Sequence, residues 1–163
     1  RRAFTLPPDT GEYAISIAAS IAKYYIRQKR EVGLVSIGKR YSILRAERGE
    51  RQLGKILETL AVLPIKGDLP LWGLISSQIT HFARGSTIVL ITPSAEEKVL
   101  TVARELQQRR LKPVVILIDG ASFGDSRSSE ELSLALANRG IVSFLIRKDD
   151  NIRSVLETPQ FAL

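Results

Sequence analysis

The chain has 163 residues, of which 44% are hydrophobic, and this is enough apolar material for one globular domain with a packed core. It contains no cysteine and a single histidine, His81. This composition excludes disulfides, thiolate chemistry and any metal site built from several histidines. No apolar run in the sequence approaches the ~20 residues that are needed to cross a bilayer.

The net charge of +7 raises the question of nucleic acid or an anionic surface as a partner. The basic residues are scattered over several segments, however, and aromatic residues do not interleave with them as in a single-strand binder. We therefore expect most of them at solvated helix ends and in loops, and we do not expect nucleic acid as a partner. An acidic protein or lipid headgroups are the alternative partners of such a basic surface.

The first half of the chain predicts a long helix, a hairpin and two further helices. Residues 10–28 place apolar side chains at the spacing of one helical stripe. Residues 32–38 and 41–45 are two strands separated by only two residues, so they must pair as an antiparallel hairpin. Amphipathic segments then predict helices over 50–61 and from Pro70 to about Phe82.

Strands and helices alternate in the second half. The expected strands are 86–92, 113–118 and 141–146, and the expected helices are 94–109 and 130–138. Ser94 is the expected N-cap of its helix, with Glu97 at the third position in a capping-box pattern. Gly140 is expected to end the last of these helices.

This alternation predicts an α/β, Rossmann-like domain over residues 1–163, with a mostly parallel sheet, helices on both faces and one antiparallel edge strand. The first helix has no clear strand before it except Arg1–Leu6 (RRAFTL), which is poor for a central strand. Either these six residues stand in for the first strand, or that strand lies upstream. Because the chain has no methionine, we expect it to be a fragment that lacks the upstream region of a longer protein. An unfilled strand position would favour strand exchange, so a homodimer is also possible.

Four stretches of the sequence resemble the C-terminal part of the domain-of-unknown-function 58 family. They are EYAISIAASIAKYYIRQKREVGLVSIG, RGERQLGKILETLAVL, GDLPL and STIVLITPS, in an order and spacing that cover roughly residues 6 to 148. The resemblance implies a von Willebrand factor A-like fold. Domains of this fold usually carry a metal-ion-dependent adhesion site, with ligands from three loops at the carboxyl edge of the sheet.

The chain departs from that metal-binding pattern in all three loops. Nothing in Arg1–Thr10 offers Asp-x-Ser-x-Ser, Leu69 stands where the second loop has threonine, and Thr92-Pro93 stands where the third has Asp-Gly. Asp68 is displaced by one residue, and a lone carboxylate makes a poor cage for a hard cation. We therefore expect a degenerate site with no metal or other cofactor.

Other residues that could carry chemistry have ordinary structural explanations. Asp119-Gly120 is typical of a turn, and Ser94 lacks the G-x-S-x-G context of a nucleophile and caps a helix. His81 is expected to be a surface group at a helix end. Trp72 could anchor a partner or could pack in the core. The candidate partner-binding residues are Asp68, Leu69, Pro70, Trp72, Thr92, Ser94 and Asp119.

These observations predict a non-enzymatic protein-interaction module whose binding surface comprises residues 67–72, 92–95 and 119–124. The family resemblance implies a membrane-anchored protein at the cytoplasmic face of the membrane that works with a MoxR-type AAA+ ATPase. The alternative is a small-molecule-binding Rossmann-like domain with its ligand at the same edge. That alternative needs an anion cradle at a helix N-terminus, and the TPSAEE segment places two glutamates there.

Overall fold

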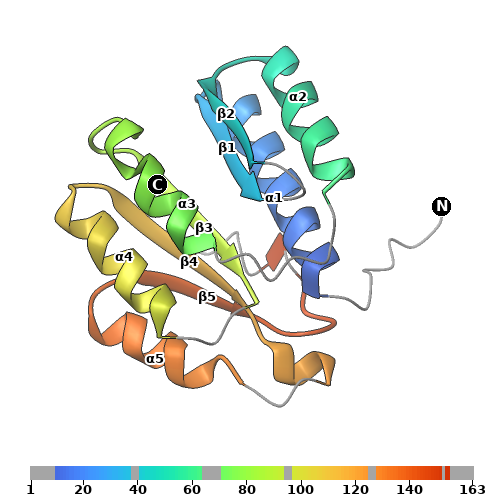
Figure 1. Ribbon diagram of the computed structural model, residues 1–163. Helices are drawn as coiled ribbons and strands as arrows, with labels where there is room; N and C mark the ends of the chain where they lie inside the picture. Colours follow the sequence, from blue (N-terminus) through green and yellow to red (C-terminus); the bar gives the residue numbers. More distant parts are fainter. Residues whose placement is uncertain are drawn as a thin grey trace.

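The computed structural model describes residues 10–37, 41–63, 71–93, 97–124, 128–151 and 153–154. The side chains of Ile37, Tyr41, Leu71, Trp72 and Leu74 lie outside this description. The described part of the chain forms an α/β fold in which helices cover both faces of a parallel sheet, and a separate hairpin lies beside that sheet (Figure 1).

The parallel sheet has three strands in the order β3-β4-β5. These strands are β3 (Thr87–Thr92), β4 (Lys112–Ile118) and β5 (Val142–Ile146). Thr92 is in register with Leu117 of the central strand. Every residue of β4 from Pro113 onward is buried, as expected for an apolar strand that is paired on both edges and covered on both faces.

Three helices cover one face of this sheet and one long helix covers the other. The first group is α3 (Leu71–Gln78), α4 (Lys98–Gln108) and α5 (Glu130–Asn138), whose apolar side chains share one core cluster with alternate residues of β3 and β4. On the opposite face, Tyr13, Ile17 and Ile21 of α1 (Thr10–Arg27) pack against the other alternate residues, such as Ile116 and Phe144.

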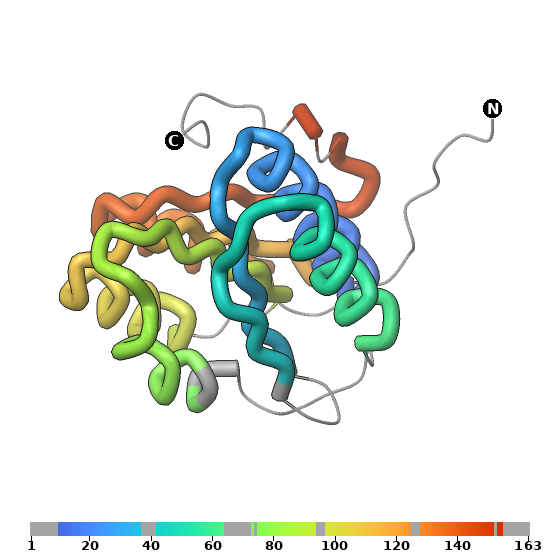
Figure 2. Tube along the Cα trace, turned by 90° about the horizontal axis from the view of Figure 1, so that it is seen from above, coloured from blue at the N-terminus to red at the C-terminus, as the bar shows by residue number. Residues whose placement is uncertain are grey.

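The hairpin consists of β1 (Val32–Ile37) and β2 (Tyr41–Glu47), which pair antiparallel. The second half of α1 and the helix α2 (Glu50–Ala61) pack together with Leu34 and Leu44 of the hairpin in a third cluster. Figure 2 shows α1 and α2 side by side, away from the helices on the far side of the parallel sheet. The hairpin therefore has its own small core, and α1 connects it to the sheet.

The expected elements are largely confirmed, with differences at their ends. The helix expected to end near Phe82 is α3 followed by a 3₁₀ turn, Ile79–His81, and His81 is exposed as expected. The helix expected from Ser94 begins at Lys98, and the expected capping serine lies outside the described residues. Gly140 has a φ of 70° after α5, a backbone conformation in which glycine is not strained.

One part of the predicted architecture needs correction. The hairpin was expected to extend the parallel sheet with an antiparallel edge strand, but among the described residues β1 and β2 form a two-stranded sheet of their own, separate from β3-β4-β5. The physical reason is that the apolar side chains Leu34 and Leu44 of the hairpin pack into a separate cluster with α1 and α2. Within the described part of the chain, none of the helices combines the length and apolar composition that are needed to span a membrane.

Candidate functional site

The loops after the three parallel strands gather at the carboxyl edge of the sheet, where ligand sites of open α/β sheets form. Thr92 ends β3, Asp119 follows β4, and Arg147 follows β5. The amide of Asp119 donates to the carbonyl of Ile146 at 2.7 Å, which extends the pairing of β4 and β5 to their ends. The loops after β4 and β5 therefore start from backbone that strand pairing holds in place.

Asp119 is the buried acidic residue of the edge, with 4% of its surface exposed. One carboxylate oxygen accepts the amide of Ser129 at 3.1 Å, and the other lies 3.8 Å from Nε of Arg147. A buried carboxylate is tolerated when it is both hydrogen-bonded and near an opposite charge. Asp119 thus ties the end of β4 to the start of α5 and to the residue after β5.

Arg147 links several acidic groups on the outside of this edge. Its guanidinium donates to Glu130 at 2.9 Å, and its amide donates to the carboxylate of Asp150 at 2.8 Å. The hydrogen bond that Arg147 donates to Glu130, with smaller contributions from the charges of Glu130, Asp119 and Asp150, raises the pKa of Arg147. A permanent cation therefore lies beside the one buried carboxylate that the described part of this edge provides.

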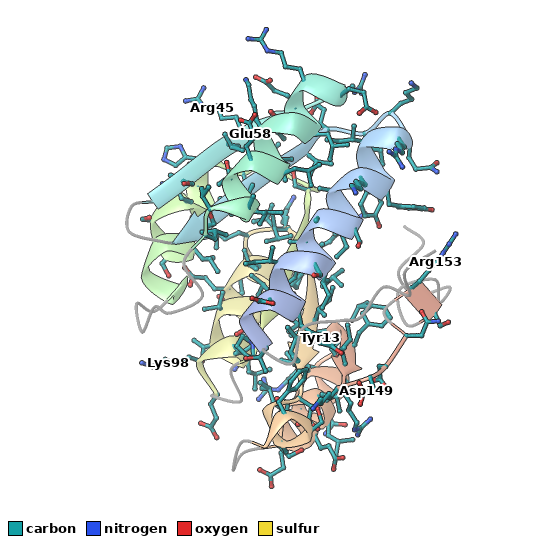
Figure 3. The ribbon with its side chains drawn as sticks, turned by 90° about the vertical axis from the view of Figure 1, so that its right-hand side faces the viewer. Tyr13, Arg45, Glu58, Lys98, Asp149 and Arg153 are labelled. Carbon is teal, nitrogen blue, oxygen red and sulfur yellow. The ribbon has the colours of Figure 1, made fainter. Side chains whose placement is uncertain are left out.

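A second group of contacts joins the start of α1 to the same edge. The hydroxyl of Tyr13 accepts the amide of Asp149 at 3.1 Å, and Figure 3 shows these two residues next to each other. The Tyr13 ring meets Phe123 edge-on, with centroids 4.8 Å apart. The hydroxyl of Ser122 donates to the carbonyl of Asp119 and accepts the amide of Lys148. These contacts fix the loops after β4 and β5 to one another.

Thr92 and Asp119 are the two candidates from the sequence whose side chains the structure describes. Both are buried, at 6% and 4% exposed, at the ends of neighbouring strands. Asp68, Leu69, Pro70 and Ser94 lie outside the described residues, and Trp72 belongs to α3 without a described side chain. Asp119 begins a tight turn, Gly120–Phe123, as its Asp-Gly sequence predicts.

The sequence analysis missed Tyr13, Ser129 and Arg147 as members of this edge. Tyr13 was assigned only to a helix, and it reaches an amide 136 positions further along the chain. Ser129 is fully buried, and its hydroxyl has no hydrogen-bond partner among the described residues. The charged run that begins with Arg147, directly after a buried strand, was a signal that could have been used.

The described residues contain no group of three or more His, Cys, Asp or Glu side chains arranged to hold a metal ion. At the carboxyl edge, the buried carboxylate of Asp119 accepts a backbone amide and lies near a guanidinium. The arrangement can present a rigid set of loop backbones and exposed side chains to a partner.

Comparisons of the chain with protein-family models, with curated proteins and with solved structures found no match.

Proposed function

We propose that this chain is a non-enzymatic protein-interaction domain with a von Willebrand factor A-like fold, in which the carboxyl edge of the sheet is kept for its surface. The contacts of the buried Asp119 carboxylate are the observation that carries this proposal. Its carboxylate serves the fold, because Ser129 donates to one oxygen and Arg147 lies beside the other. A divalent cation needs several free oxygen ligands, and it would have to displace this internal pairing.

The sequence of the β3 terminus supports the same proposal. Thr92 stands where a metal-binding relative of the proposed fold has aspartate, and its side chain is buried. Two charges of opposite sign, Asp119 and Arg147, already balance each other at the next two strand ends. This edge is thus poorly suited to binding a cation and better suited to contacts with a partner protein.

The exposed residues of this edge could make those contacts. Pro93, Ala121, Lys148 and Asp149 are exposed, and each follows or lies near the end of a buried parallel strand. Loops held by a rigid sheet are common positions for binding residues. The family resemblance makes a MoxR-type AAA+ ATPase the partner that we propose. From the same resemblance we propose that the protein works at the cytoplasmic face of a membrane.

Binding of a purified MoxR-type AAA+ ATPase, measured by biolayer interferometry, tests the surface. Ala121→Arg and Lys148→Glu at the carboxyl edge should weaken binding at least about tenfold, the loss expected for blocking a central contact. The matched controls are Ala137→Arg and Lys112→Glu. Their residues are also exposed but belong to the C-terminal turn of α5 and the start of β4, at the opposite edge. Equal losses in both pairs, or no binding by the unmodified chain, would contradict the proposal.

A melting experiment tests the degenerate metal site separately. Magnesium, manganese and calcium at millimolar concentration should each leave the melting temperature of the chain within about 2 °C of its value in EDTA. A larger rise with any of the three ions would show a functional metal site. A nucleotide that raised the melting temperature in the same assay would instead support the small-molecule-binding alternative.

A further inference from the structure

The helix-to-strand connections of the parallel sheet lie together at its amino edge. Because the strands are parallel, the segments that lead into β3, β4 and β5 all meet there, opposite the candidate site. The amide of Gly85 donates to the carbonyl of Arg110 at 3.0 Å. The amide of Lys112 donates to the carbonyl of Ser86 at 2.9 Å, so two of these connections are joined directly. Figure 1 shows α4 and α5 side by side, both ending on the same side of the sheet.

These connections carry a set of exposed cations. We define the basic edge as Arg84, Arg109, Arg110, Lys112 and Arg139, all of which are exposed. No ion pair joins any of them to an acidic residue in the part of the chain that the structure describes. Glu105, four positions before Arg109, is the acidic residue nearest to any of them in the sequence. The positive charge of this edge is therefore largely uncompensated.

The carboxyl edge has the opposite balance of charge. Among the described residues near the strand ends and helix starts of that edge, acidic side chains outnumber basic ones: Glu97, Asp119, Glu130, Glu131, Asp149 and Asp150 against Lys98, Arg147 and Lys148. The net charge of +7 is therefore distributed unevenly, with an excess of positive charge at the amino edge. A charge distribution of this kind orients a protein near a charged surface.

The helix caps place cations where the backbone favours glycine. The helices α1, α4 and α5 close with the same pair of backbone hydrogen bonds; in α4, for example, the amide of Leu111 donates to the carbonyl of Leu106 at 3.0 Å. Glycine is usual at the left-handed residue of this cap, and α5 has Gly140 there with a φ of 70°. At the same position α4 has Arg110, with a φ of 60°, and α1 has Lys29, with a φ of 63°. A side chain in this conformation lowers backbone stability, so a gain from the charge has to compensate for it.

The helix dipole explains only part of the basic edge. A cation at a helix C-terminus interacts favourably with the dipole, and this accounts for the C-cap residues Arg109 and Arg139. The dipole does not require Arg110 in place of glycine, and it does not apply to Lys112, the first residue of β4. Much of the positive charge at this edge therefore has no role inside the described fold.

We propose that the basic edge binds the headgroups of an anionic lipid bilayer and holds the domain with its carboxyl edge facing away from the bilayer. Among the described residues, the exposed large hydrophobic side chains all lie outside these connections: Tyr24, Ile43, Val62 and Leu134. Protein partners are usually bound through aromatic or apolar anchors, and single-stranded nucleic acid stacks on aromatic rings. An anionic bilayer needs neither, because it attracts cations within about 10 Å by charge alone.

The geometry of the edge disfavours a nucleic-acid duplex. A duplex reader lays a helix or a two-stranded ribbon along a groove. At the basic edge, α4 and α5 end and the three parallel strands begin, so no described element lies lengthwise along it. The proposal does not depend on the partner ATPase proposed above, since the two surfaces are at opposite edges of the sheet.

Co-sedimentation with lipid vesicles tests the proposal. Vesicles of about 30% phosphatidylserine in phosphatidylcholine should bind the chain at about 50 mM NaCl and release it at about 500 mM, because salt screens the charges. The double variant Arg110→Gly with Lys112→Gln removes two cations and restores glycine at a left-handed position, so its fold should persist. It should bind at least about tenfold more weakly, since each cation near such a surface strengthens binding about fivefold. The matched control, Lys55→Gln with Lys98→Gln, removes the same charge from exposed positions on α2 and at the start of α4, and its binding should stay within about twofold.

Equal losses in the two double variants, or equal binding to vesicles of phosphatidylcholine alone, would overturn the proposal. Tighter binding to a duplex DNA oligonucleotide than to the anionic vesicles at the same salt would also overturn it and would assign the edge to nucleic acid. If the first double variant folded poorly, Arg84→Gln with Arg139→Gln is the second, with the same expected loss. Binding of the AAA+ ATPase should be unchanged in the basic-edge variants, so failure of either proposal can be recognised separately.

Discussion

The parallel sheet and the hairpin are built from similar apolar sequences but are stabilised differently. The central strand β4 has helices on both faces and strands on both edges, and Ile116 is fully buried there. In the hairpin, Leu34 and Leu44 face the α1–α2 cluster, while Ile43 remains 45% exposed. The apolar content of a strand therefore does not decide its burial, which depends on what packs against each face.

In each region, a buried polar side chain joins elements to one another. In the sheet, Asp119 joins the end of β4 to α5. In the hairpin, the amide of Gln52 on α2 donates to the carbonyls of Val32 and Arg45, both at 2.8 Å. These carbonyls lie beside a shift in strand register between Val32 and Leu34. The backbone approach is close there, because a Cβ added to Gly33 would lie 2.7 Å from the carbonyl oxygen of Leu44. The sheet thus depends mainly on its apolar core, and the hairpin depends more on a few specific contacts.

The largest effect should come from the core of the sheet. Ile116→Ala should lower the free energy of unfolding by about 2–5 kcal/mol, because it leaves a cavity between two packed faces. The matched change Ile43→Ala in the hairpin should cost under about 1 kcal/mol, since this side chain is partly solvated. Urea unfolding measures both. Similar losses would mean that the two regions are packed alike.

Loss of the Gln52 hydrogen bonds to the hairpin should have the next largest effect on stability. Gln52→Leu should cost about 1–3 kcal/mol, because it removes both donors from two strand carbonyls while keeping an apolar side chain of similar size. Amide exchange should rise first in β1 and β2, ahead of the parallel sheet. Gln108→Leu, at the exposed end of α4, is the control and should be nearly neutral. Uniform loosening of both regions would contradict a local role for Gln52.

Loss of the Asp119 contact in the parallel sheet should lower stability less, because the apolar core of the sheet remains. Asp119→Ala should cost about 1–2 kcal/mol, since the amide of Ser129 is left buried without its acceptor. Asp119→Asn keeps an acceptor oxygen and should recover a large part of that loss. Thermal unfolding of the three proteins checks this order. If the asparagine variant were as unstable as the alanine variant, the charge of Asp119 rather than its hydrogen bond would be the stabilising feature.

The smallest effect concerns alkaline pH and α1, which connects the two regions. Burial raises the pKa of Tyr25 above 10.0, although the nearby Arg30 opposes this shift. The folded state therefore holds this phenolic proton more tightly. The resulting stability is complete below the unfolded pKa and is lost as pH rises from about 10 through the folded pKa. Urea unfolding at increasing pH should show a shallower alkaline decline for Tyr25→Phe than for the unmodified chain, and an unchanged decline would contradict this assignment.

The elements were predictable because each has a local signal. The apolar stripe of residues 10–28 and the alternation after residue 85 correspond to α1 and to the β3–β5 units within a few residues. The short link between residues 38 and 41 required a hairpin, and β1 and β2 form one. The candidate site was predictable only in part. Thr92 and Asp119 follow apolar runs that mark strand ends, whereas Tyr13 reaches this edge through packing that no local pattern encodes.

The sequence by itself determined the helices, the strands, their parallel or antiparallel sense and the edge where the loops gather, because hydrophobic periodicity and short connections are local properties. The tertiary structure alone decided that, within the described part of the chain, the hairpin and the parallel sheet form separate ladders, and that β3 is partly buried while β4 is buried from Pro113 onward. It also decided that Asp119 is held by Ser129 and Arg147. The reason is physical: pairing, burial and charge compensation depend on groups distant in sequence, and only the packed chain brings them together.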